Sequence, residues 1–82
     1  AAPKGTPVFA TGDGVVSRAD YSDTYGLVIY IDHGFGYETR YAHLHKYELK
    51  LGQEVKRGQL VGYVGTTGQS EAYHLHYEVL HN

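Results

Sequence analysis

Residues 27–44 read LVIYIDHGFGYETRYAHL, and this stretch predicts two antiparallel strands joined by a tight turn. Residues 27–32 form the most β-branched run in the chain, which is typical of a strand. Gly34-Phe35-Gly36 supplies the turn, because glycine readily adopts the positive φ angles of short hairpin connections. Residues 37–44 then form the returning strand. The chain is therefore expected to be built from antiparallel β-structure.

The remaining residues repeat this pattern of short apolar runs separated by glycine and polar turns. No stretch shows a sustained apolar period of 3.6 residues, so almost no helix is expected. Further strands are expected at residues 6–10, 15–19, 59–64 and 73–80, with a loop at 20–26 and one helical turn near 46–50. A length of 82 residues allows a single domain. The predicted fold class is all-β.

Composition excludes several classes of protein and site. The chain has no cysteine, which rules out disulfides and thiolate metal sites. Its formal charge is −2 and its basic residues are scattered, so it lacks the clustered basic residues that are typical of a nucleic-acid-binding protein. No apolar run approaches the roughly 20 residues that a membrane-spanning helix needs. A functional site in this chain must therefore be built from side chains other than cysteine.

The six histidines carry most of the functional information, and His74-Leu75-His76 stands out among them. Side chains alternate faces along a strand, so His74 and His76 are expected to share one face. Imidazole is a common zinc ligand, and it also titrates near neutral pH, which suits proton transfer. A solvent-facing strand with two incidental histidines explains the spacing almost as well.

His43 adds a third imidazole at the end of the strand at residues 37–44. Alternation places it on the same face as Thr39 and Tyr41. If this strand and the last one line the same cleft, then His43, His74 and His76 converge. Taken alone, His43 would more often be a histidine with a purely structural role. We interpret His33 as structural, His45 as a surface or rim residue on the assumption that the strand stops, and His81 as solvated.

Five ordered blocks resemble the lysostaphin/LytM-type zinc metallopeptidase family. They are GTPVFATGDGVV at 5–16, YAHL at 41–44, GQEVKRGQ at 52–59, GYVGTTG at 62–68 and HLHYE at 74–78. A His-Leu-His triplet alone is a weak signal, whereas five blocks in order over almost the whole chain are a strong one. The resemblance implies a barrel-sandwich-type core in which antiparallel sheets form a groove.

The resemblance also implies a chemistry for the three histidines. The family holds one Zn²⁺ ion with a His and an Asp of a His-x-x-x-Asp motif and with the second histidine of His-x-His, here His76. The first histidine of that pair, His74, and the strand histidine, His43, flank the activated water as general base and oxyanion stabiliser. The implied activity is hydrolysis of peptide bonds in bacterial peptidoglycan, in the cross-bridge or the stem peptide. The implied location is extracytoplasmic, in the cell envelope or secreted.

The sequence departs from the family at one important place. No His-x-x-x-Asp occurs in the 82 residues, so they are interpreted as one peptidase core that lacks this N-terminal segment. The longer parent is expected to be a metalloendopeptidase, and the activity of these residues alone is left open. The main alternative is a non-catalytic LytM-like domain that binds the wall or regulates another wall hydrolase.

A second alternative is a biotinyl- or lipoyl-type carrier, because residues 55–65 resemble the glycine-punctuated hairpins of such domains. Carriers present a lysine at an exposed hairpin tip for acylation. Lys46, Lys50 and Lys56 lack the methionine- or aspartate-flanked context of such a lysine. The carrier interpretation therefore ranks below both LytM-type interpretations.

Overall fold

The computed structural model describes residues 3–65 and 76–81 of the chain. This part of the chain forms seven strands and contains no helix, so no helix in it could cross a membrane. The strands are β1 (Pro7–Phe9), β2 (Gly14–Ser22), β3 (Gly26–Gly34), β4 (Tyr37–Tyr47), β5 (Glu54–Val55), β6 (Leu60–Val64) and β7 (His76–His81). The predicted all-β fold class is confirmed.

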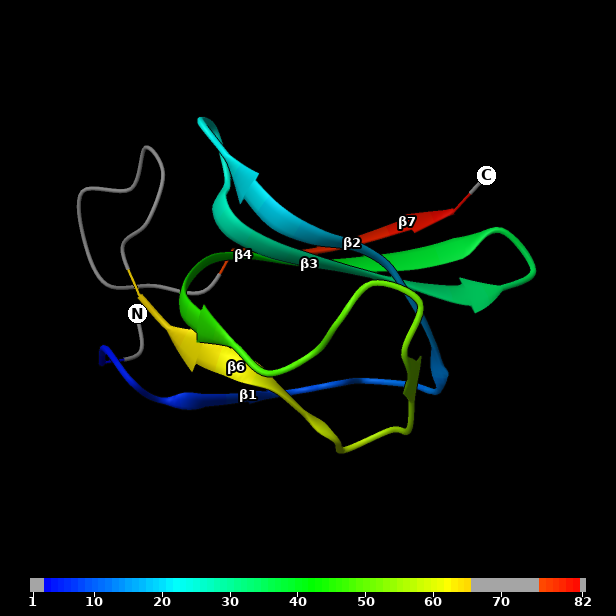
Figure 1. The fold of residues 1–82 in the computed structure, drawn as a ribbon. Coiled ribbons are helices and arrows are strands. Elements are labelled where there is room, and N and C mark those ends of the chain that lie inside the picture. Colours follow the sequence, from blue (N-terminus) through cyan, green and yellow to red (C-terminus); the bar gives the residue numbers. More distant parts are fainter. Residues whose placement is uncertain (1–2, 66–75, 82) are drawn as a thin grey trace.

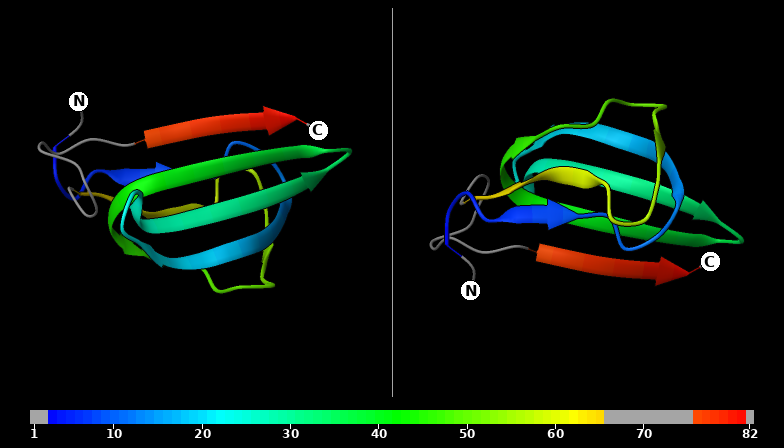
Figure 2. Two further views of the ribbon diagram at one scale, coloured as in Figure 1. Left: turned by 90° about the horizontal axis from the view of Figure 1, so that it is seen from above. Right: turned by 90° about the horizontal axis from the view of Figure 1, so that it is seen from below.

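The strands form one curled antiparallel sheet in the order β1-β6-β4-β3-β2-β5, with β7 paired to β4. The long strand β4 organises it, because its first part pairs with β3 and β7 while its last residues pair with β6. The curl brings β1 and β6 beneath the layer formed by β2, β3, β4 and β7 (Figure 1). Figure 2 shows β7 along the outer side of the β3–β4 hairpin.

The core fills the space between these two layers. Ile29 and Ile31 of β3, Tyr41 of β4 and Val61 of β6 are almost completely buried and belong to one apolar cluster. Close packing of this kind requires a glycine where β6 crosses β4. A Cβ atom on Gly62 would lie 2.9 Å from the Cα of Tyr47, nearer than real atoms approach. Glycine at position 62 therefore allows β6 to lie directly against the end of β4.

Three sequence expectations about boundaries are wrong. The strand expected to end at residue 44 continues to Tyr47, because Lys46 and Tyr47 pair with Tyr63 and Gly62 of β6. This pairing also excludes the helical turn expected at 46–50. The loop expected at 20–26 shrinks to residues 23–25, since β2 stays paired with β3 as far as Ser22. The expected strand at 73–80 is described from His76 onward and reaches His81.

Candidate functional site

Four side chains form a ladder across the face of the sheet that turns away from β1 and β6. Arg18 pairs with Tyr30, Tyr30 with Arg40, and Arg40 with Glu78, so the ladder crosses β2, β3, β4 and β7 in turn. Their neighbours along the strands, such as Ile29 and Tyr41, point into the core on the other face. We call the face that carries the ladder the open face. The family resemblance implies a groove with a sheet as its floor, and the open face is the candidate for that floor.

The ladder is held by stacking and ion pairs. The guanidinium carbons of Arg18 and Arg40 lie 5.1 and 4.4 Å from the centre of the Tyr30 ring. Arg40 Nε donates to Glu38 Oε2 at 2.7 Å, and this hydrogen bond raises the pKa of Arg40 above its ordinary value. Arg40 Nη1 also lies 3.9 Å from Glu78 Oε1. Arg40 is therefore a permanent cation held in one orientation across the open face.

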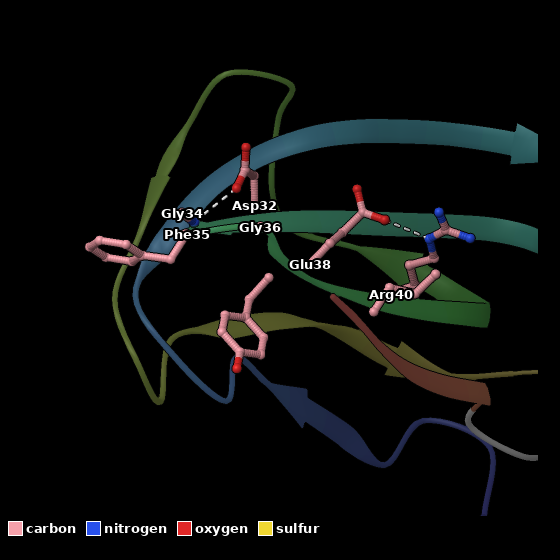
Figure 3. A pocket seen from close by; sticks show the side chains of 8 residues that line it. Asp32, Gly34, Phe35, Gly36, Glu38 and Arg40 are labelled. Atoms are coloured by element: carbon pink, nitrogen blue, oxygen red, sulfur yellow. Dashed lines mark hydrogen bonds and ion pairs between the residues drawn. The ribbon is translucent and has the colours of Figure 1, made fainter. Parts of the chain in front are cut away.

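A hollow of about 350 Å³ extends the open face toward the β3–β4 turn. Asp32, Glu38, Arg40 and Leu80 line it together with the turn itself (Figure 3). Asp32 Oδ1 accepts a hydrogen bond from the backbone N–H of Gly34 at 2.8 Å and so braces the turn. Phe35 at the tip of the turn lines one end of the hollow and is 95% exposed. The open face thus presents charged side chains from β3, β4 and β7 around this hollow and beside it.

His43 lies in a bulge of β4. Ile29 pairs with Tyr41 and Leu27 with Leu44. Between these two pairs β4 has two residues where β3 has one, which defines a β-bulge. His43 adopts a φ of 57°, a left-handed conformation that costs a non-glycine residue about 1–2 kcal/mol. Its backbone N–H donates to Tyr25 O at 2.7 Å, and its carbonyl accepts from Gly65 N at 3.1 Å. The backbone around this histidine is therefore held from both sides.

The bulge overturns the predicted face of His43. Simple alternation grouped it with Thr39 and Tyr41, and these two do share the inner face, where Thr39 Oγ1 donates to the Tyr41 hydroxyl at 3.1 Å. The His43 ring instead stands edge-on to the ring of Tyr25, with centroids 6.5 Å apart. The Tyr25 hydroxyl reaches Glu78 on the open face. The extra residue therefore turns the His43 imidazole, 7% exposed, toward the side of the sheet that carries Glu78.

Strand pairing brings the position of His76 next to this bulge. The backbone of His76 pairs with Ala42, the residue before His43. His74 and the side chain of His76 lie outside the described residues, so the meeting of three imidazoles stays a prediction. Within residues 3–65 and 76–81, no three His, Cys, Asp or Glu side chains are grouped closely enough to hold a metal ion.

Two of the other three histidines, His33 and His81, have contacts that explain their positions without a role in catalysis. Both ring nitrogens of His33 are bonded, to Asp13 O and to Thr39 Oγ1, each at 2.7 Å, as expected of a structural residue. His45 is exposed as predicted, although β4 continues past it. His81 is exposed, and its ring stacks on Tyr37 with centroids 4.1 Å apart.

A relay of hydroxyl groups ties the inner face together beneath the site. From His33 it runs through Thr39 to the Tyr41 hydroxyl, which also accepts from the backbone N–H of Thr11 at 3.3 Å. Thr11 Oγ1 then lies 3.0 Å from the Tyr77 hydroxyl on β7. The relay joins the loop after β1 to β3, β4 and β7. It therefore contributes to the alignment of the strands on which His43 and His76 lie.

The Thr39→Val variant tests this relay. Thr39 is 5% exposed, and valine keeps its shape while removing the hydroxyl bonded to His33 and Tyr41. Leaving buried polar partners unpaired should lower the free energy of unfolding by about 1–3 kcal/mol, measured by urea denaturation. Thr24→Val, in the exposed turn between β2 and β3, is the control. A loss at Thr39 below about 0.5 kcal/mol, the level of surface changes, would contradict the relay.

Sequence reasoning missed the residues around His43 on the open face. Tyr25 fell in an expected loop, and Arg40 and Glu78 were not singled out. The alternating charges Arg18-x-Asp20 and Glu38-x-Arg40 are a signal, because charged residues two apart on a strand share one face. The spacing within one strand does not show which residues of the neighbouring strands these charges face. Only the pairing of β4 with β3 and β7 shows that these charges meet.

Comparison with known proteins gives consistent results. The model of peptidase family M23 matches residues 1–82. Peptidoglycan DD-endopeptidase ShyC of Vibrio cholerae is 47% identical over 81 residues, which make up 99% of this chain and 19% of ShyC. The chain thus spans about a fifth of the length of this curated relative.

Solved structures repeat the fold with high similarity. A zinc-containing peptidase from Vibrio cholerae aligns with a TM-score of 0.95 and 46% identity over 99% of this chain and 25% of its own. The catalytic domain of lysostaphin from Staphylococcus simulans aligns with a TM-score of 0.94 and 38% identity over 99% of this chain and 62% of its own. Because the family match covers every residue and the fold agrees throughout, the chain belongs to peptidase family M23, as its resemblance to the lysostaphin/LytM type predicts.

Proposed function

We propose that the protein carrying this chain is a zinc-dependent endopeptidase that hydrolyses peptide bonds of bacterial peptidoglycan, in the cross-bridge or the stem peptide. The observation that carries the proposal is the bulge in β4, which turns His43 toward the open face beside the position paired with His76. The activity in the name of ShyC and the zinc in the description of the second Vibrio cholerae protein support it. Residues 1–82 act as a single core domain in this proposal.

The histidines take separate roles. His76 is a metal ligand, and its imidazole fits Zn²⁺ because neutral imidazole is among the ligands that zinc prefers. When bound, zinc lowers the pKa of water to about 7 and polarises a carbonyl group. The other ligands belong to the His-x-x-x-Asp motif of the family, which these 82 residues do not contain. The proposed metal site therefore needs ligands in addition to His76 that these 82 residues do not supply.

His74 and His43 handle protons and charge. His74 accepts the proton of the attacking water and returns a proton to the leaving amine, for which an imidazole titrating near neutrality is well suited. His43 donates a hydrogen bond to the oxyanion that develops on the scissile carbonyl. Donors of this kind are worth about 3–4 kcal/mol of transition-state stabilisation in other enzymes. The open face holds the peptide, and an extracytoplasmic location follows from the substrate.

The test uses the zinc-loaded longer protein and purified peptidoglycan sacculi. Soluble muropeptides should appear, their release should stop when a chelator removes the zinc, and added Zn²⁺ should restore it. Mass spectrometry of the products identifies the bond that is cut. A protein that binds sacculi with no zinc and releases no product would contradict the proposal and would be the non-catalytic LytM-like domain instead.

A further inference from the structure

Tyr25 contacts His43 in two ways. Its carbonyl accepts the His43 backbone N–H at 2.7 Å, which helps to hold the left-handed bulge. Its ring meets the imidazole edge-on, at an interplanar angle of 72° and a centroid distance of 6.5 Å. Edge-to-face contact at this distance is a favoured arrangement of aromatic rings. One residue therefore contacts both the backbone and the ring of His43.

Tyr25 is itself anchored at both ends. Its backbone N–H donates to Ser22 Oγ at 2.8 Å, which fixes the turn between β2 and β3. Its hydroxyl donates to Glu78 Oε1 at 3.2 Å. Glu78 lies on β7, two residues after His76, and it pairs with Arg40 on β4. Tyr25 thus connects the bulge that carries His43 to the strand that carries His76.

We propose that Tyr25 is a positioning residue, which sets the His43 imidazole relative to β7 through its ring, its carbonyl and its hydroxyl. The inference rests on the proposed function for its catalytic consequence. β7 pairs with β4 alone among the described strands. The Tyr25–Glu78 hydrogen bond additionally ties β7 to Tyr25, the residue whose ring and carbonyl contact His43. An oxyanion donor displaced by a fraction of an ångström loses much of its effect on rate.

The variant Tyr25→Phe isolates this role, because it keeps the ring and the carbonyl and removes only the hydroxyl, which binds Glu78 and also Arg40. In the zinc-loaded longer protein, kcat for a soluble muropeptide should fall about tenfold, with KM within about twofold and zinc content unchanged. Tyr21→Phe is the matched control, since Tyr21 is 57% exposed on β2, and it should leave kcat unchanged. A kcat for Tyr25→Phe within twofold of the wild type would overturn the inference.

A double-mutant cycle with Glu78→Ala tests whether the hydroxyl acts through Glu78. Residues that act as one unit have non-additive effects, so the double variant should match the slower single variant in kcat. Fully additive losses would overturn the inference. Additive losses are the result expected if the Tyr25 hydroxyl and Glu78 act separately.

A second readout does not depend on activity. The imidazole nitrogen and carbon-bound proton signals of His43, observed by NMR, should shift in Tyr25→Phe and stay in place in Tyr21→Phe. Unmoved signals in Tyr25→Phe would overturn the inference. If the wild-type protein cleaves no peptidoglycan, the proposed function fails by itself, and the His43 signals still decide whether Tyr25 positions the ring.

Discussion

Replacing His76 by alanine is expected to remove both the zinc ion and the hydrolysis of peptidoglycan. A catalytic zinc site keeps three protein ligands and one open position, so the loss of one ligand leaves too few to retain the metal. Zinc content should fall from one ion per chain to a small fraction of that. The rate of muropeptide cleavage should fall at least about a thousandfold, because the water loses its activation. Elemental analysis and product chromatography measure the two quantities.

His81→Ala is the matched control for this experiment. His81 lies on the same strand as His76, is exposed, and stacks on Tyr37 rather than meeting the bulge in β4. Its removal should leave both zinc content and cleavage unchanged. Full zinc occupancy in His76→Ala would contradict the assignment of residue 76 as a ligand.

Replacing His74 by alanine is expected to abolish hydrolysis while the zinc ion stays bound. General acid–base groups typically contribute 10²–10⁴ to a rate, so cleavage should fall by about that factor. Zinc content should match the wild type, since His74 moves protons in this scheme and does not hold the metal. Initial rates on a soluble muropeptide, measured beside zinc content, give the answer.

His45→Ala serves as the comparison, because His45 is an exposed histidine on β4. It should retain both the rate and the metal. Wild-type activity in His74→Ala would refute its role as general base, and loss of zinc would make it a ligand instead. Together the variants at 74 and 76 separate the two histidines of one triplet by different measurements.

The hairpin at the centre of the fold could be predicted from local chemistry. A β-branched run, a Gly-Phe-Gly turn and a returning aromatic strand leave few alternatives, and β3 and β4 indeed contain both expected strands. The strand ends were less predictable, because tertiary pairing decides them. Residues 45–47 carry no strong strand signal, and the strand continues through them since Lys46 and Tyr47 pair with β6. The two-residue strand β5 exists only through its pairing with the start of β2.

The candidate site was predictable in its residue types and less so in its geometry. His43 could be singled out, but alternation assigned it to the wrong face. Period-2 reasoning assumes an unbroken ladder, and one inserted residue reverses every assignment that follows it. Four successive buried residues, Tyr41 to Leu44, mark the break in the structure. No local feature of YAHL indicates a bulge, because it arises from the pairing with β3.

The left-handed backbone at position 43 affects how its mutagenesis should be designed. Alanine there would delete the imidazole and also strain the main chain, so lost activity would mix a chemical effect with a folding defect. Asparagine tolerates this region of φ far better. His43→Asn is therefore the cleaner probe. The difference in stability between a glycine and an alanine variant, both of which lack the imidazole, would measure the backbone contribution.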